Sequence, residues 1–248
     1  MNDELKRILR MVAEKKITPE DAARLIEALE PGRRRDKGIF TFIEEMEDVG
    51  KIATGKKILR FPAKRSIDIK GMSGDISIEG RDTDQITLTG GGLLFTKEDH
   101  NRIRVKALSG DLKAVLPHRI DLSLSSASGD VEISDLEGEL QLKVAAGDLM
   151  IREFAGRIEI GGVFGDLDLD LKHLEDGKIK AVFGEMVIGL PDEDIEVEVR
   201  LKKGGRIKNE AGLEVLEEKR NSFRGRLGKG THQLRIEGKG GKVILKRR

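Results

Sequence analysis

The sequence predicts an all-β protein built as a parallel β-solenoid, with coils of about 18 residues and two short strands in each coil. Three observations predict this fold. Gly-Asp pairs recur at a nearly constant spacing, apolar residues alternate with polar ones between them, and nothing between these strands has helical periodicity. The expected domains are an α-helical hairpin over residues 1–31, a basic linker with a capping helix over 32–57, and the solenoid over 58–248.

A glycine followed by an acidic residue marks one corner of each predicted coil. Successive pairs are 36, 19, 18, 18 and 19 residues apart, and Gly92 falls midway across the longest gap. The pairs are Gly74-Asp75, Gly110-Asp111, Gly129-Asp130, Gly147-Asp148, Gly165-Asp166 and Gly184-Glu185. Glycine reaches positive φ without strain, and aspartate can hydrogen-bond its own turn. We therefore expect about ten rungs stacked in chain order, with parallel pairing and a right-handed coil.

The alternation between the corners predicts which side chains fill the solenoid. Successive residues of a strand point to opposite faces, so every second residue faces inward. The expected core rows contain Ile133, Leu142, Ile151, Ile160, Leu169 and Ile179.

Two apolar stripes at the N-terminus predict a pair of short amphipathic helices. Thr18 and Pro19 between them suit the N-cap and the first position of the second helix. About thirty residues cannot bury enough surface to fold alone, so the stripes need a partner. The residues expected to form an oligomerisation surface are Leu5, Ile8, Leu9, Val12, Leu25, Ile26 and Leu29.

A basic run, residues 33–37, precedes a third apolar stripe over residues 38–53. This stripe predicts a helix that covers the open end of the solenoid. The alternative is a helix lying on a membrane surface, although Glu44, Glu45, Glu47 and Asp48 would be repelled by anionic lipid.

Composition excludes several classes of protein. With no Cys there are no disulfides and no thiolate metal sites. A net charge of +1 argues against nucleic acid as a partner, and the lack of Trp and Tyr argues against sites that stack sugars or bases. No signal peptide or membrane span is predicted, so the expected location is the cytoplasm, with envelope association as the alternative. Many charges and few amides fit a thermostable protein.

No motif for catalysis or a cofactor is found. The four histidines lack zinc-site spacing, and no phosphate-binding loop or nucleophile elbow occurs. Asp166 and Asp168 share a strand face, as a glycosidase pair could, but surface acids are abundant. The stacked acidic corners could bind calcium, although turn capping is the favoured role. We expect no enzyme, no cofactor and no metal.

Charge is divided unevenly along the chain. Residues 121–200 contain 20 acids and 7 bases, a net of −13, whereas residues 201–248 contain 15 bases and 5 acids, a net of +10. This indicates either ordinary surface decoration or attraction between the acidic body of one molecule and the basic C-terminal segment of another.

The repeated Ser-Gly-Asp followed by alternating apolar residues, at Ser73–Ile78 and Ser128–Ile133, resembles a bacterial "putative adhesin" family of β-strand-repeat proteins, the YvlB-like proteins. The segment Ile8–Ala23 resembles the SHOCT-like bihelical segment that precedes this domain. The resemblance implies a solenoid, self-association and a link to the cell envelope or envelope stress, with no catalytic residues. We therefore expect a non-enzymatic, self-associating scaffold or adhesin-like binding protein. The alternatives are a surface module that binds a polysaccharide or an envelope protein, and a solenoid glycosidase.

Overall fold

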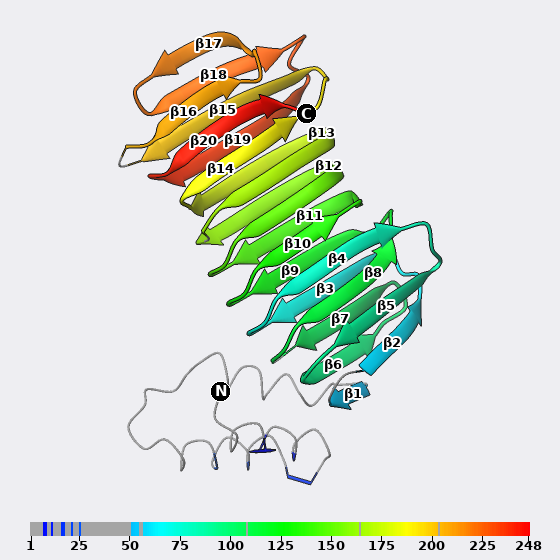
Figure 1. Cartoon of the computed structure of the whole chain (residues 1–248). Coiled ribbons are helices and arrows are strands. Elements are labelled where there is room, and N and C mark those ends of the chain that lie inside the picture. Colours follow the sequence, from blue (N-terminus) through cyan, green and yellow to red (C-terminus); the bar gives the residue numbers. More distant parts are fainter. Residues whose placement is uncertain are drawn as a thin grey trace. The chain divides into compact units, whose positions relative to one another are not determined.

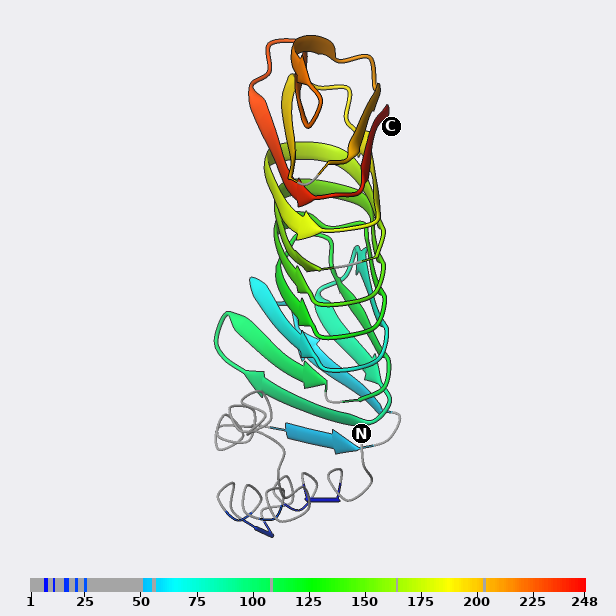
Figure 2. The same ribbon diagram turned by 90° about the vertical axis from the view of Figure 1, so that its left-hand side faces the viewer.

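A computed structural model describes residues 51–54, 57–107, 109–163, 165–202 and 204–248. It also describes Arg7, Ile8, Met11, Lys16, Ile17, Asp21 and Leu25. The chain divides into two compact units: residues 1–52 with 95–97, and residues 53–94 with 98–248. The second unit is a β-solenoid, as the sequence predicts, and its coils lie one above another in Figure 2.

Each coil of the solenoid places one strand on each of two faces. Within the described residues, ten strands lie side by side on the first face. In spatial order they are β2 (Lys57–Pro62), β5 (Gln85–Gly90), β8 (Leu112–Pro117), β4 (Ile76–Arg81), β10 (Val131–Ser134), the first part of β12 (Leu149–Val163), the first part of β13 (Leu167–Val182), β14 (Glu185–Leu190), β20 (Lys242–Arg247) and β16 (Arg206–Glu210).

The second face of the described solenoid also has ten strands. They are β7 (Arg102–Ala107), β3 (Ser66–Gly71), β9 (Asp121–Ser126), β11 (Glu137–Val144), the second parts of β12 and β13, β19 (His232–Lys239), β15 (Ile195–Lys202), β18 (Ser222–Leu227) and β17 (Glu214–Lys219). The remaining two strands, β1 (Lys51–Thr54) and β6 (Leu93–Glu98), pair with each other.

The coils do not stack in chain order, so that part of the sequence prediction is wrong. The coil formed by β3 and β4 lies between the β7–β8 coil and the β9–β10 coil. Near the other end, β19 lies between β13 and β15, and β20 lies between β14 and β16. Figure 1 shows the cyan β3 and β4 among green strands, and the red β19 and β20 between yellow and orange ones. The 36-residue gap therefore separates two corners that are direct neighbours in space.

Antiparallel strands lie at both ends of the parallel stack, which the sequence analysis also did not predict. At one end β2 and β5 run antiparallel to their neighbours, and at the other end β18 runs antiparallel to both β15 and β17. The end strand β17 carries Glu214, Glu217, Glu218 and Lys219 along its exposed length. Charged side chains on an edge strand discourage further strands from pairing there.

The interior of the solenoid consists of apolar rows, as predicted. Ile133, Ile151 and Leu169 are aligned on the first face. All six predicted core residues, including Leu142, Ile160 and Ile179, are at most 1% exposed. Period-two alternation puts these side chains inside and their charged neighbours outside, so the hydrophobic effect holds every rung to the next.

Little of the predicted helical hairpin falls on described residues. Of its seven predicted oligomerisation residues, only Ile8 and Leu25 are described; both are helical, Ile8 is buried and Leu25 is 43% exposed. Leu5, Leu9, Val12, Ile26 and Leu29 lie outside the described residues. The predicted helix over residues 38–53 also lies outside them up to residue 50. Residues 51–53 belong to strand β1, so the helix prediction is wrong there. Among described residues, no helix has both the length and the apolar content needed to cross a membrane.

Candidate binding groove

The acidic corners predicted from the repeat come together as a continuous ladder. In spatial order it contains Asp111, Asp75, Asp130, Asp148, Asp166 and Glu185. The Oδ1 atom of each aspartate accepts a hydrogen bond from the backbone N–H of the next member, at 2.7–3.1 Å. The sequence analysis expected each aspartate to cap its own turn, whereas these side chains cap the neighbouring coil.

Backbone hydrogen bonds join the same corners in the opposite direction. The N–H of Ile76 donates to the carbonyl of Asp130 at 2.9 Å, and the N–H of Val131 donates to the carbonyl of Asp148 at 2.9 Å. Each corner therefore receives one bond from a neighbour and returns another. A hydrogen bond from a backbone N–H to a carboxylate is charge-assisted and stronger than one between neutral groups, so these bonds join each coil to the next.

A groove of about 960 Å³ lies beside the ladder on the first face. Strands β5, β8, β4, β10, β12, β13, β14 and β20 all contribute to its lining. Eight strands make seven steps of about 4.8 Å, so the groove extends roughly 34 Å, the length of about ten residues of extended peptide. The groove is therefore long and narrow enough for an extended chain.

Eight carboxylates and two amines line this groove. The carboxylates belong to Asp75, Asp111, Asp130, Glu132, Asp148, Asp166, Asp168 and Glu185, and the amines belong to Lys113 and Lys246. Acids outnumber bases four to one, and a concave surface with low-dielectric walls focuses the field of such a charge distribution.

A second row of groove residues was missed in the sequence. It consists of the outward-facing residues two positions after each acidic corner: Ser77, Lys113, Glu132, Met150, Asp168 and Val187. Residues i and i+2 of a strand share a face. The constant offset from each Gly-Asp pair was the signal that could have revealed this row, because only Asp166 and Asp168 were noticed as a pair.

Asp170 lies two residues beyond Asp168 on the same strand, in surroundings that disfavour its charged form. Burial raises the pKa of Asp170 above its ordinary value, and the neighbouring carboxylate of Asp168 raises the pKa further. The Nε atom of Arg248 lies 3.4 Å from its Oδ2 atom. Because the folded-state pKa is raised, ionised Asp170 opposes folding, and this opposition is relieved as the pH falls through the folded-state pKa.

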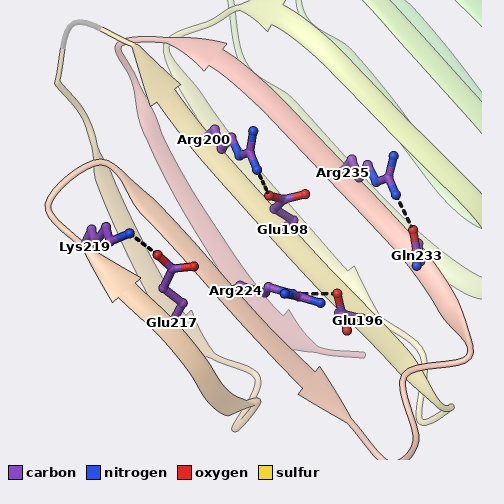
Figure 3. A network of polar contacts seen from close by, with 8 residues as sticks. All are labelled: Glu196, Glu198, Arg200, Glu217, Lys219, Arg224, Gln233 and Arg235. Atoms are coloured by element: carbon purple, nitrogen blue, oxygen red, sulfur yellow. Dashed lines mark hydrogen bonds and ion pairs between the residues drawn. The ribbon is translucent and has the colours of Figure 1, made fainter.

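The basic C-terminal segment and the acidic segment identified in the sequence form ion pairs within one chain. The Nζ atom of Lys242 lies 2.9 Å from Glu185, and Arg247 lies 3.5 Å from Asp192. The basic residues after position 200 thus belong to strands that pair with acidic strands. Figure 3 shows four polar pairs on the outer surface of β15, β17, β18 and β19. Arg224 and Glu196, 2.8 Å apart, join two strands, whereas the other three pairs lie within single strands.

The described residues offer no ready metal centre in the groove. No group of three or more His, Asp or Glu side chains in this part of the chain is arranged to hold a metal ion. The ladder carboxylates point along the stack toward backbone N–H groups, which makes turn capping the role that the geometry supports.

The fold and its groove define the class of protein: a β-solenoid with an elongated acidic groove on one face. The family model described as "Toastrack DUF4097" matches residues 32–246, and the chain belongs to this family. Residues 3–34 match a model described as a SHOCT-like domain. These matches confirm the resemblance seen in the sequence.

Solved structures similar to the chain are described as adhesins. A "putative cell adhesion protein" from Clostridium sporogenes is 14% identical, with a TM-score of 0.48, and the match covers 78% of this chain and 100% of that one. A "putative adhesin" from Parabacteroides merdae is 10% identical, with a TM-score of 0.31, and the match covers 80% and 97%. Another from Bacteroides fragilis is 11% identical, with a TM-score of 0.32, covering 80% and 98%. No curated protein matches the chain.

Proposed function

We propose that this protein is a non-enzymatic, adhesin-like binding protein whose groove holds an extended, positively charged segment of a partner protein. The observation that carries the proposal is the groove itself, which is lined by carboxylates from six successive strands of one face and the corners that precede them. A peptide with lysine or arginine at regular intervals would place its cations against these carboxylates.

Three features favour a peptide over a polysaccharide. The groove has the length of about ten extended residues. Its charge is strongly negative, and Met150 and Val187 supply apolar surface for aliphatic side chains. The chain has no Trp or Tyr to stack against sugar rings. Neutral oligosaccharides therefore serve as the comparison ligand in the test below.

We expect a labelled peptide of alternating arginine and glycine to bind, as followed by fluorescence anisotropy. The double variant Glu132→Lys with Asp168→Lys should weaken this binding at least tenfold, because it reverses two charges in the groove without altering the ladder. The matched control is Glu139→Lys with Glu159→Lys, which makes the same charge change on the second face. The control should bind within about twofold of the parent.

Two results would contradict the proposal. Equal losses in both double variants would show that only the net charge matters. Binding of neutral oligosaccharides that competes with the peptide would favour the polysaccharide-binding alternative. Circular dichroism of every variant establishes that the solenoid is intact.

The helical hairpin supplies a second element of the proposed function, the gathering of several copies. Leu25 is helical and 43% exposed, so its side chain is free to contact another chain. Leu9→Glu with Leu25→Glu should lower the mass measured by light scattering to that of one chain, because charges would enter the interface between hairpins. The β-type circular dichroism should stay unchanged. An unaltered mass would show that the hairpin is not the oligomerisation element.

A further inference from the structure

Two histidines far apart in the sequence meet beside the turn that joins β14 to β15. His173 belongs to β13, and His232 is the first residue of β19. Their ring centroids are 5.5 Å apart and their planes are inclined at 77°. The intercalation of β19 next to β13 creates this proximity, which has no signal in the sequence.

The Nδ1 atom of each ring faces an oxygen acceptor. The Nδ1 of His173 lies 2.7 Å from Oε2 of Glu193, and the Nδ1 of His232 lies 3.2 Å from the backbone carbonyl oxygen of Glu175. In the neutral imidazole, such an acceptor holds the proton on Nδ1 and leaves a lone pair on Nε2. Within the described part of the chain, neither Nε2 atom has a hydrogen-bond partner. Metal-binding histidines in proteins have this arrangement, with a carboxylate or carbonyl behind the ring.

We propose that the Nε2 atoms of His173 and His232 together bind one divalent transition-metal ion, with Zn²⁺, Ni²⁺ or Cu²⁺ as the fitting class. Two nitrogens on one tetrahedral zinc are roughly 3.4 Å apart, and two rings with centroids 5.5 Å apart are close enough for both to reach one ion. Imidazole nitrogen suits these ions, whereas Mg²⁺ and Ca²⁺ prefer oxygen.

The proposed site has two protein ligands. No three His, Asp or Glu side chains in the described residues are arranged to hold an ion, so water completes the coordination. Glu193 acts from behind His173: its carboxylate contacts Nδ1 and orients the ring. Both histidines and Glu193 are partly exposed, which gives an ion a route from solvent.

Metal binding would stabilise the C-terminal coil whose strand β19 lies between β13 and β15. His232 lies at the start of β19, which is held between β13 and β15, and Glu193 belongs to the turn before β15. An ion on both rings would connect these elements, and the solenoid would gain stability as the free metal concentration exceeds the dissociation constant. This site is distinct from the groove, and its failure would leave the proposed function untouched.

The test is a titration of the full-length protein with Zn²⁺ and Ni²⁺ at pH 7.5, followed by calorimetry and by thermal unfolding. We expect one ion per chain and a higher melting temperature. His173→Ala and His232→Ala should each weaken binding at least tenfold, and Glu193→Gln should weaken it less. The matched control is His118→Ala: the Nδ1 of His118 lies 2.9 Å from the carbonyl oxygen of Asp135, but no second imidazole stacks on it among the described residues.

The proposal is overturned if His173→Ala binds as tightly as the parent or if His118→Ala loses as much affinity. It is equally overturned if no heat and no thermal shift appear at millimolar metal. A response to calcium that survives both histidine variants would place the ion on the aspartate ladder instead.

Discussion

Ile151→Asp is expected to unfold the solenoid or to lower its melting temperature by more than ten degrees. Ile151 is fully buried in β12, between Ile133 of β10 and Leu169 of β13. A carboxylate there would lack a partner and leave a gap among the apolar rows on both sides. Such changes belong to the most damaging class, with losses of about 4 kcal/mol or more.

The neighbouring residue provides the control for this prediction. Met150 precedes Ile151 on the same strand and faces the groove. Met150→Asp should therefore change the melting temperature by only a few degrees. Thermal melts followed by circular dichroism measure both variants, and equal behaviour of the two would disprove the assignment of inner and outer faces.

Gly129→Val should be almost as damaging, through the backbone. Gly129 has a φ of 105°, which L-residues rarely adopt. A Cβ atom at this position would lie 2.2 Å from the carbonyl oxygen of Gly74 in the adjacent coil. The two corners would have to separate, and the hydrogen bond from the N–H of Asp130 to Asp75 would break. We expect a loss of roughly 3 kcal/mol or more.

A substitution at Gly212 tests how much of that loss comes from the backbone conformation and how much from the close contact between corners. Gly212 also has a positive φ, of 71°, but a Cβ there would meet no atom within 4 Å. Gly212→Ala should lose only about 1 kcal/mol, the usual cost of the backbone conformation alone. If urea unfolding gives similar losses for both variants, then close stacking of the corners contributes little to stability.

Local patterns in the sequence predicted the coils but not their order. Alternation identified buried residues such as Ile151, and the Gly-Asp spacing identified the corners, because both are properties of a single coil. The order depends on which coils meet, and the corners are nearly interchangeable. Ile76 pairs with Leu112 on one side and with Val131 on the other, and all three positions carry the same kind of apolar residue after an acidic corner.

Electrostatic pairing favours the order at the C-terminal end. With β19 and β20 inserted, Arg248 lies 3.4 Å from Asp170, and Lys242 lies 2.9 Å from Glu185. These pairs bring the basic C-terminal segment against acidic strands of the same chain. The sequence showed the charge imbalance, but the charges alone did not distinguish attraction within one molecule from attraction between two.

The sequence predicted only part of the candidate site, because the rest depends on which coils lie next to each other. The acidic corners follow from the repeat, and their stacking was expected. The hydrogen bonds from each aspartate side chain to the next coil were not expected. The direction in which a corner side chain points depends on the position of the neighbouring coil. The groove and the histidine pair both need several coils in place, so neither can be recognised from one coil.

The central claim, that the groove on the first face holds a cationic peptide, is tested most directly at Met150. This residue lines the groove, and its methyl group can be observed by NMR in the intact protein. Adding the arginine–glycine peptide should shift or broaden the Met150 methyl signal in proportion to the fraction bound, and the Glu132→Lys, Asp168→Lys variant should show a much smaller change. A Met150 signal that stays unchanged while anisotropy reports a bound peptide would place the binding surface elsewhere and contradict the account.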